Sequence, residues 1–254
     1  MKNCAIVIPA YRKLNAYEKF SYYALKSVIK DKDIYVVCGN NFESELKENT
    51  ERFDDAYFNS SFDYSRLCKS YEFYNRFSNY KYILIYQLDC LIFRDDIDYW
   101  CDKDYDYIGS PIVSRVAGWS SIPIVGNGGF SLRKVEYFKS ITDTEGDFRK
   151  KYDLSLEIHR KKNLYETFED LYFCEFVNSK WRFDVPTIEE SLHFSIDMNP
   201  DKVFNRERGL PMGCHAFCKN IPFWEKIVKF PEEVKEAAYK EHGYFMNAYY
   251  NRKP

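Results

Sequence analysis

The chain begins with apolar runs and helical periodicity that together predict a βαβ unit. Residues 4–10 form an apolar run that ends at a proline turn, and residues 33–40 form a second run. Strand, helix and strand within about forty residues predict parallel pairing and a right-handed crossover. The apolar positions between the runs recur at steps of three and four, as on a helix face packed against a sheet: Tyr17, Phe20, Ala24 and Val28.

The apolar run from Tyr82 to Phe93 predicts a strand that stops at a carboxylate, Asp89. Strands buried on both faces are hydrophobic throughout, and ligands of open α/β sheets bind beyond the carboxyl ends of the strands. Asp89 is therefore placed to meet a cation or a polar ligand. Taken alone, an acid at this position serves equally well as the cap of a turn or of the next helix.

Weaker patterns predict a third strand at 56–58, a helix over 64–77 and a short strand at 107–111. Residues 124–133 hold three of the ten glycines within four positions, which favours a β-bulge or the close approach of a ligand. This segment is not a phosphate loop, because it has neither the Walker spacing nor a GxGxxG turn into a helix.

The second half of the chain alternates predicted loops and helices. Residues 112–123 are loop-like, and the charged segment 141–163 is the best candidate for a mobile loop. Helical periodicity returns from residue 164, and residues 185–197 predict a short strand and turn followed by a helix. Residues 231–243 predict an amphipathic helix with proline in its first turn.

Composition favours one α/β domain and argues against nucleic-acid binding. The chain has 254 residues, of which 45% are hydrophobic, and this is enough for a sizeable core. The net charge is −2 and the charged residues are spread along the chain, so no basic surface for nucleic acid is indicated. The aromatic fraction of 19% includes many tyrosines, which offer a polar ligand both an apolar face and a hydroxyl.

The eight cysteines predict neither a disulfide framework nor a zinc site. No CxxC is present, and the group Cys214-His215-Cys218 lacks a second pair of ligands. Met1 leads directly into a strand-like segment, and no apolar stretch approaches the ~20 residues of a membrane span. We expect a cytoplasmic protein, with peripheral contact at the inner face of a membrane left open.

Four polar features stand at the ends of the apolar elements: Asp89, the turn at 127–129, the pair Glu169-Asp170, and His215. A divalent cation bound to a diphosphate needs few protein ligands, and an imidazole is acceptable for manganese. Asp89 and His215 supply that minimum, which leaves Asp170 free to take a proton from an attacking hydroxyl. Structural explanations also exist, because acids favour the first turn of a helix and His215 could be a buried, hydrogen-bonded histidine.

Five motifs follow one another between residue 5 and about residue 224: Val7-Ile8-Pro9-Ala10-Tyr11, Tyr86-Gln87-Leu88-Asp89, Gly126 to Arg133, Glu169-Asp170, and Gly213-Cys214-His215-Ala216-Phe217. In order and spacing the chain resembles the GT-A glycosyltransferases, close to a bacterial family of glycosyltransferase-like proteins of capsule and lipopolysaccharide loci. The resemblance implies an α/β, Rossmann-like fold with a mixed, mostly parallel sheet flanked by helices. It divides the single domain into a nucleotide-binding half at about 1–110, an acceptor-binding half at about 111–225 and the C-terminal helix.

The resemblance also implies a role for each motif. Asp89 is the metal-binding second acid of an Asp-x-Asp motif for Mn²⁺ or Mg²⁺, His215 is a late metal or diphosphate ligand, and Asp170 is the general base. Asn127, Gly128 and Gly129 line the sugar and acceptor cleft, and Glu169 holds a sugar hydroxyl. The donor nucleotide is bordered by Pro9, Tyr11, Arg12, Arg66, Lys69 and Gln87.

One residue departs from the pattern, because Gln87 stands where the first acid of Asp-x-Asp is expected. A neutral amide can still contact a ribose, but the metal site loses one charge. The metal requirement is therefore open, and metal-independent transfer remains an alternative.

We expect a nucleotide-sugar-dependent glycosyltransferase of the hexosyltransferase type, with a UDP-sugar favoured as donor. It would transfer one sugar, with inversion, to a saccharide or lipid-linked saccharide in surface polysaccharide synthesis. A sugar-phosphate nucleotidylyltransferase is an alternative, although residues 7–13 lack the glycine-rich loop of that class. A catalytically silent carbohydrate-binding protein is a second alternative, and it would account for Gln87 and the aromatic residues.

Overall fold

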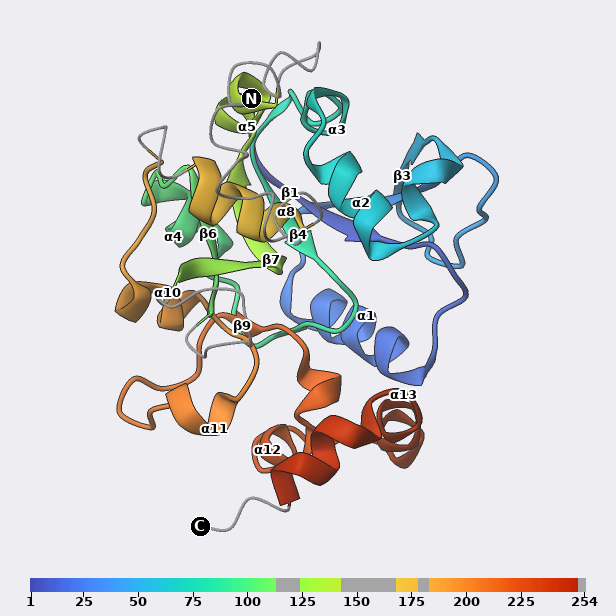
Figure 1. Ribbon diagram of the computed structural model, residues 1–254, viewed down its shortest axis with the longest axis vertical. Helices are drawn as coiled ribbons and strands as arrows, with labels where there is room; N and C mark the ends of the chain where they lie inside the picture. The colour runs from blue at the N-terminus through green and yellow to red at the C-terminus, as the bar shows by residue number, and fades with distance from the viewer. Residues whose placement is uncertain (113–123, 143–167, 178–182, 251–254) are drawn as a thin grey trace, which may run out of the picture.

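The computed structural model describes residues 1–112, 124–142, 168–177 and 183–250. Within these residues six strands form a mixed sheet in the order β3-β2-β1-β4-β7-β6 (Figure 1). The first four are parallel to one another, whereas β7 is antiparallel to both β4 and β6, so the predicted mostly parallel sheet is confirmed. The strands are β1 (Lys2–Pro9), β2 (Asp33–Gly39), β3 (Asn49–Phe53), β4 (Tyr80–Tyr86), β6 (Tyr107–Ile112) and β7 (Ile124–Lys134).

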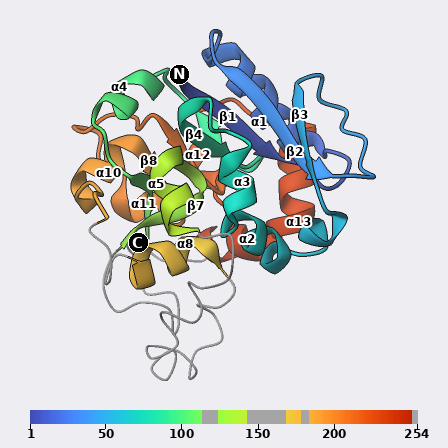
Figure 2. The same cartoon turned by 90° about the horizontal axis from the view of Figure 1, so that it is seen from above.

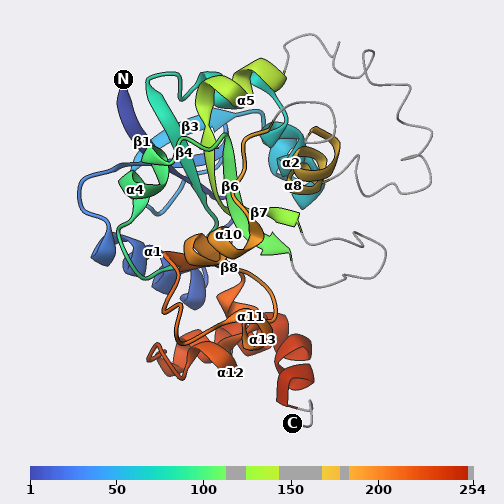
Figure 3. The same cartoon turned by 90° about the vertical axis from the view of Figure 1, so that its left-hand side faces the viewer.

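Helices cover both faces of this sheet because its inner strands are apolar on both sides. Successive residues of a strand point to opposite faces, and Ile6 and Ile8 of β1 pack into one apolar cluster while Ala5 and Val7 pack into another. The first cluster includes α1, α4 and α10, and the second includes α2, α3 and α5 (Figures 2 and 3). The helices are α1 (Ala16–Val28), α2 (Ser61–Cys68), α3 (Tyr71–Asn75), α4 (Ile97–Asp102), α5 (Val135–Ile141), α8 (Glu169–Leu171) and α10 (Ile188–Phe194).

A smaller sheet of three short strands, in the order β5-β9-β8, lies below the main sheet in Figure 1. β9 is antiparallel to β5 and parallel to β8. Beneath it the C-terminal helices share a third apolar cluster with the helix α1, against which α13 packs. These elements are β5 (Leu91–Ile92), β8 (Ser195–Ile196), β9 (Gly213–Cys214), α11 (Pro200–Val203), α12 (Ile221–Trp224), α13 (Glu232–Tyr250), and the short helical turns η1 (Asp55–Phe58), η3 (Tyr172–Val177) and η4 (Phe217–Lys219).

Among the described residues, none of the helices combines the length and the apolar content needed to cross a lipid bilayer.

Most of the predicted elements are confirmed. The runs 4–10 and 33–40 are parallel neighbours in the sheet, and the helix between them covers the predicted apolar positions. The glycine-rich segment 124–133 is a strand whose pairing with β6 is irregular at Gly109 and Ser110, as a β-bulge requires.

The predicted third strand is wrong, because residues 55–58 form a 3₁₀ turn and the strand lies earlier, at Asn49–Phe53. Among the described strands, β3 is at the edge of the sheet and pairs with β2 alone. Its sequence, Asn-Thr-Glu-Arg-Phe, buries only the last side chain. An edge strand of this kind carries no apolar pattern from which it could be predicted.

Two predicted elements are each divided in the structure. The helix predicted over 64–77 is two helices, because Ser70 ends one turn and caps the next by accepting a hydrogen bond from the Phe73 amide. The strand predicted over 82–93 ends at Tyr86, and its last apolar residues form β5 in the smaller sheet. Asp89 therefore lies in the connection between two sheets.

The C-terminal predictions need smaller corrections. Within residues 185–197 the helix comes first, and the short strand β8 follows it. The final helix passes the predicted end at residue 243, continues to Tyr250 and is kinked at His242. Most of the predicted loops at 112–123 and 141–163, and the predicted start of a helix at 164, lie outside the described residues, but Ile112 is the last residue of β6 and Ile141 the last of α5.

Candidate functional site

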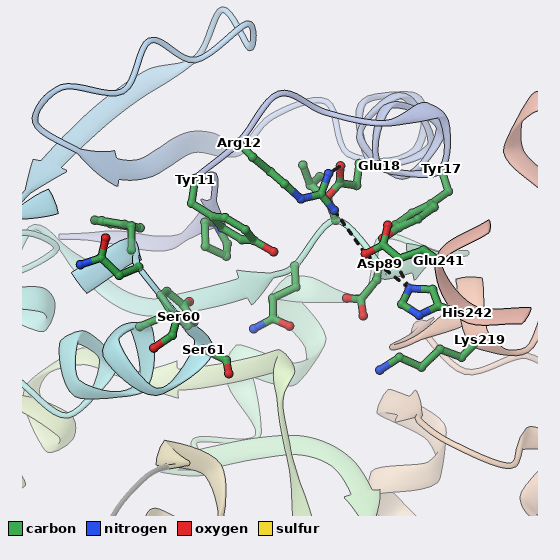
Figure 4. A pocket seen from close by; sticks show the side chains of 16 residues that line it. Tyr11, Arg12, Tyr17, Glu18, Ser60, Ser61, Asp89, Lys219, Glu241 and His242 are labelled. Carbon is green, nitrogen blue, oxygen red and sulfur yellow. Dashed lines mark hydrogen bonds and ion pairs between the residues drawn. The ribbon is translucent and has the colours of Figure 1, made fainter. Parts of the chain in front are cut away.

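A pocket of about 330 Å³ lies at the carboxyl ends of β1 and β4, the two strands at the centre of the sheet. Chain connections leave β1 and β4 toward opposite edges of the sheet, and such a switch point is where α/β folds bind ligands. Figure 4 shows Asp89, Lys219 and His242 together at one end of the pocket and Tyr11, Ser60 and Ser61 toward the other. The pocket is therefore charged at one end and aromatic and hydroxyl-bearing at the other.

The wall formed by β1 and α1 is held by a capping box. Asn15 caps α1 by accepting from the Glu18 amide, and Glu18 Oε2 accepts in return from the Asn15 amide at 2.8 Å. The same oxygen is 2.9 Å from Arg12 Nη1, and Arg12 also lies 3.5 Å from Glu241 of α13. Arg12 thus lines the pocket with its charge already neutralised by two carboxylates.

The smaller sheet brings three polar side chains together at one end. Asp89 precedes β5, Asp197 follows β8 and His215 follows β9. Because β8 and β9 are parallel and β5 is antiparallel to β9, these three positions lie at the same end of the smaller sheet. His215 is fixed further by its backbone amide, which donates to the Ile196 carbonyl at 2.9 Å.

The two side chains predicted as metal ligands face each other without a hydrogen bond. Asp89 Oδ1 and His215 Nε2 are 3.2 Å apart, and both atoms are buried without a hydrogen-bond partner among the described residues. The other ring nitrogen, His215 Nδ1, is 2.9 Å from Asp197 Oδ1. A carboxylate behind the imidazole is the usual way to fix the ring of a metal-binding histidine.

These residues fit a divalent cation. The carboxylate of Asp89, the thiol of Cys90 and the ring of His215 offer ligand atoms that lie within 4.8 Å of one another. Burial opposes the charge of Asp89, but the His215 ring beside it more than offsets this and lowers the pKa of Asp89 to about 2. Burial likewise opposes protonation of His215, yet Asp89 and Asp197 raise the pKa of His215 to about 10. The site thus favours a positive charge between its acids.

Two adjacent glycines connect this site to the Glu169-Asp170 pair. A Cβ at Gly129 would collide with His215 Nε2 and lie 2.7 Å from Gln87 Oε1, and a Cβ at Gly128 would collide with Glu169 Oε1. The Gly128 amide also donates to Asp170 Oδ2 at 3.3 Å. The close approach predicted for this segment is therefore present on both sides of the strand.

Glu169 and Asp170 are the first two residues of α8, in agreement with their predicted position near the start of a helix. The N-cap residue is Phe168, and no side chain makes an N-cap hydrogen bond. Glu169 is buried, with Oε1 3.0 Å from Arg133 Nη2 and Oε2 accepting from the Ser65 hydroxyl at 3.0 Å. Burial, and then the negative charge of Glu169, raise the pKa of Asp170 to about 7. A carboxylate that titrates near neutrality is suited to act as a general base.

The structure brings some of the predicted residues to the pocket and not others. Pro9, Tyr11, Arg12, Gln87 and Asp89 line it, whereas the other predicted residues, Asn127, Gly128, Gly129, Glu169, Asp170 and His215, are not part of its lining. Arg66 and Lys69 are not part of its lining. Arg66 pairs with Asp63 and lies over the Tyr57 ring, and Lys69 lies over the Tyr172 ring.

Sequence reasoning missed the contribution of the C-terminal segment. Lys219, Glu241 and His242 line the pocket, and His242, to which no role was assigned, lies 3.5 Å from the Tyr17 hydroxyl. Burial and the nearby Lys219 lower the pKa of His242. Asp197 was also missed. Lys219 could have been predicted as a pocket residue, because it lies only four residues after His215. Glu241 and His242 could not, because they are more than 220 residues from Arg12 in the sequence.

A comparison with protein-family models identifies one family. A model of the family described as "Protein of unknown function (DUF5672)" matches residues 47–215. A search of curated proteins finds no match.

Alignment with solved structures identifies the fold of this chain. The glycosyltransferase GlyE of Streptococcus pneumoniae TIGR4 aligns with a TM-score of 0.52 and 14% identity over 98% of this chain and 63% of GlyE, so this chain spans less than two thirds of GlyE. The galactosyltransferase LgtC, in complex with donor and acceptor sugar analogues, aligns with a TM-score of 0.53 and 16% identity over 83% of this chain and 86% of LgtC. Mouse xyloside xylosyltransferase 1 aligns with a TM-score of 0.53 and 10% identity over 84% of this chain and 97% of that protein. At these identities the likeness shows the fold, and the predicted GT-A fold is confirmed.

Proposed function

Because the chain belongs to the DUF5672 family of proteins of unknown function and has the GT-A fold, we propose that it is a glycosyltransferase that moves a sugar from a nucleotide donor to a saccharide hydroxyl. The observation that carries the proposal is the pair of Asp89 and His215, whose facing atoms, Asp89 Oδ1 and His215 Nε2, lie 3.2 Å apart as an ion pair but have no hydrogen-bond partner among the described residues. Asp89 lines the charged end of the pocket, so this pair would bind a ligand there.

The pocket suggests how the donor lies. The nucleoside would occupy the end with Tyr11, Ser60 and Ser61, where an aromatic face and hydroxyls are available. The diphosphate would lie toward Asp89 and Lys219. We favour a UDP-sugar as the donor, since a pocket of about 330 Å³ is at the small end of the range for ligand sites.

The residues present divide the chemistry between the pocket and α8. Asp170 takes the proton of the acceptor hydroxyl as its oxygen bonds to the anomeric carbon, and the bond from that carbon to the diphosphate breaks as the nucleoside diphosphate leaves. A single displacement of this kind inverts the anomeric configuration. Asp89 and His215 would hold Mn²⁺ or Mg²⁺, which would supply positive charge to stabilise the leaving diphosphate.

For the acceptor we propose a saccharide or lipid-linked saccharide, with a hexose as the transferred sugar and surface polysaccharide synthesis as the process. Proton NMR of the product then reports the configuration at the new linkage, and retention of configuration would exclude Asp170 as the base of a single displacement.

The test is a screen of nucleotide sugars for hydrolysis and transfer, read by mass spectrometry. Asp89→Ala and Asp170→Asn should each lose most of the turnover. Asp102→Ala is the matched control, because this exposed acid ends α4 and lies outside the pocket lining. Activity near that of the wild type in both site variants would overturn the proposal.

Gln87 favours a second candidate, a catalytically silent carbohydrate-binding protein, because this neutral amide lines the pocket where a second acid would strengthen a metal site. Thermal shifts with nucleoside diphosphates, with and without Mn²⁺, separate the two candidates. A ligand that binds only the folded state raises the melting midpoint. Stabilisation by saccharides alone, and by no nucleotide, would favour the silent protein.

A further inference from the structure

Arg133 is a fully buried arginine whose donors all point toward the Glu169 side of the sheet. Nη2 lies 3.0 Å from Glu169 Oε1, Nη1 donates to the Tyr74 hydroxyl at 3.0 Å, and Nε donates to the Ser131 hydroxyl at 3.0 Å. The guanidinium carbon is 5.7 Å from the centres of the Tyr107 and Phe138 rings. Arg133 is thus fixed by bonds and by aromatic packing.

Glu169 is bound just as completely. Its side chain is 8% exposed, and each carboxylate oxygen has a partner within the protein, Arg133 for Oε1 and the Ser65 hydroxyl for Oε2. Both oxygens of this buried carboxylate are therefore already engaged within the protein. The sequence-based assignment of Glu169 as a sugar ligand has no support in these contacts.

We propose that Arg133 and Glu169 are positioning residues that fix the Asp170 carboxylate for proton transfer. The proposal rests on the proposed function of Asp170 as the general base. Glu169 anchors the first residue of α8 to β7 through Arg133 and to α2 through Ser65. Asp170 is the next residue, so its backbone position follows from this anchor.

The remaining contacts complete the placement of Asp170. Its Oδ2 accepts from the Gly128 amide at 3.3 Å, and its Oδ1 accepts from the Leu171 amide at 2.8 Å. Gly128 also contacts the anchor, because its carbonyl accepts from Arg133 Nη2 at 3.4 Å. Arg133 therefore holds both the helix that carries Asp170 and the strand that donates to it.

The same network extends to the wall of the pocket. Ser65, the α2 partner of Glu169, follows Tyr64, which lines the pocket together with Ser60 and Ser61. One helix thus contacts the donor pocket and the anchor of Asp170. This arrangement ties the position of the base to the pocket in which the donor would bind.

A purely structural role is the competing explanation. A buried ion pair is weak evidence for stability, because apolar residues of similar volume often stabilise a core as well or better. The two explanations differ in what an apolar replacement does: a structural pair can be exchanged without loss of turnover, whereas a positioning pair cannot.

The first test is Arg133→Met combined with Glu169→Met, which removes both charges together. We expect a folded protein with a cooperative melting transition, a kcat lowered on the order of 100-fold, and a donor KM within about twofold of the wild type. The matched control is Arg76→Met with Glu72→Met, an exposed pair at 3.1 Å formed by a residue of α3 and the residue that follows its end, which should leave kcat unchanged. Wild-type kcat in the buried double variant would overturn the proposal.

The second test uses Glu169→Gln, which preserves the shape of the side chain and its bond to Arg133. Because a negative neighbour is removed, the Asp170 carboxyl should titrate at lower pH, by on the order of one unit. The pKa of Asp170 is measured by ¹³C NMR with carboxyl-labelled aspartate, and the resonance that is missing in Asp170→Asn is assigned to Asp170. The acid limb of the pH dependence of kcat/KM measures the same pKa independently. An unchanged titration in Glu169→Gln contradicts the proposal even if the double variant does not fold.

The NMR titration also separates this proposal from the proposed function. If no nucleotide sugar is turned over by the wild type, the glycosyltransferase assignment fails while the titration still measures whether Glu169 acts on Asp170. If turnover is present and the titration is unmoved, the positioning proposal alone fails.

Discussion

The candidate cation site around Asp89 and the group around Asp170 contact different residues of the pair Gly128-Gly129, and they are built in opposite ways. Asp89 and His215 face each other at 3.2 Å, and neither facing atom has a hydrogen-bond partner among the described residues. Glu169 is bonded to Arg133 and Ser65, and Arg133 donates as well to Tyr74 and Ser131. This difference is why we propose that the first group binds a cation and that the second positions Asp170.

The electrostatics of the two groups differ in the same sense. The pKa of Asp89 is lowered to about 2 because the His215 ring outweighs the effect of burial. The pKa of Asp170 is raised to about 7 by burial and by Glu169. One acid is therefore kept charged, as a cation ligand must be, and the other can exchange a proton near neutral pH.

The largest effect is expected for Asp170→Asn, which keeps the shape of the side chain but removes its basicity. General base catalysis contributes about 10²–10⁴-fold, so kcat should fall by that amount while donor KM stays close to the wild-type value. Steady-state kinetics with the donor found in the screen measure both constants. A change in KM with kcat preserved would place Asp170 in binding and not in proton transfer.

The two glycines allow the comparison to be tested one methyl group at a time. Gly129→Ala places a Cβ against His215 Nε2, so we expect Mn²⁺ affinity to fall on the order of 100-fold while the fold is kept. Gly128→Ala places a Cβ against Glu169 Oε1 and should instead lower the free energy of unfolding by about 1–3 kcal/mol. Calorimetric metal titration and urea denaturation separate the two outcomes. Equal effects of both variants on Mn²⁺ affinity would show that the two groups are not distinct.

The sequence predicted the elements that carry these groups better than the contacts between them. Residues 4–10 and 82–86 were readable as strands because burial on both faces makes them apolar throughout. The polar edge strand Asn49–Phe53 gave no such signal. Asp89, His215 and the glycines were identified as candidate residues because they interrupt apolar segments.

The partners of those residues depend on long-range packing that no local pattern contains. Asp197 stands 18 residues before His215, and its contact with the ring depends on the pairing of β8 with β9. Arg133 read as the end of the glycine-rich strand, and only the packing of α8 on β7 joins it to Glu169. Glu241 and His242 reach the pocket because α13 packs against α1.

A smaller effect is expected for Asp197→Asn, which tests whether the carboxylate behind His215 supports the cation site. The amide oxygen can still accept from His215 Nδ1, but the negative charge behind the ring is lost. Substitution of such a partner costs about 10–100-fold in metal affinity, and we expect the lower end because the bond is retained. Calorimetric titration with Mn²⁺ measures this. Asp184→Asn, a change outside the pocket lining, is the control, and an equal loss in both would contradict the assignment.

The smallest effect concerns the stability of the Asp170 group as a function of pH. The folded-state pKa of Asp170 is raised above the ordinary value of 3.8, so its contribution to stability is complete below that value and is lost as the pH rises through about 7. Asp170→Asn removes this dependence, and the variant should gain at least ~1 kcal/mol of unfolding free energy relative to the wild type between pH 5 and pH 8. Urea denaturation of both proteins at the two pH values measures the gain. If the two proteins respond to pH identically, Asp170 does not hold a proton in the folded state, and its difference from Asp89 disappears.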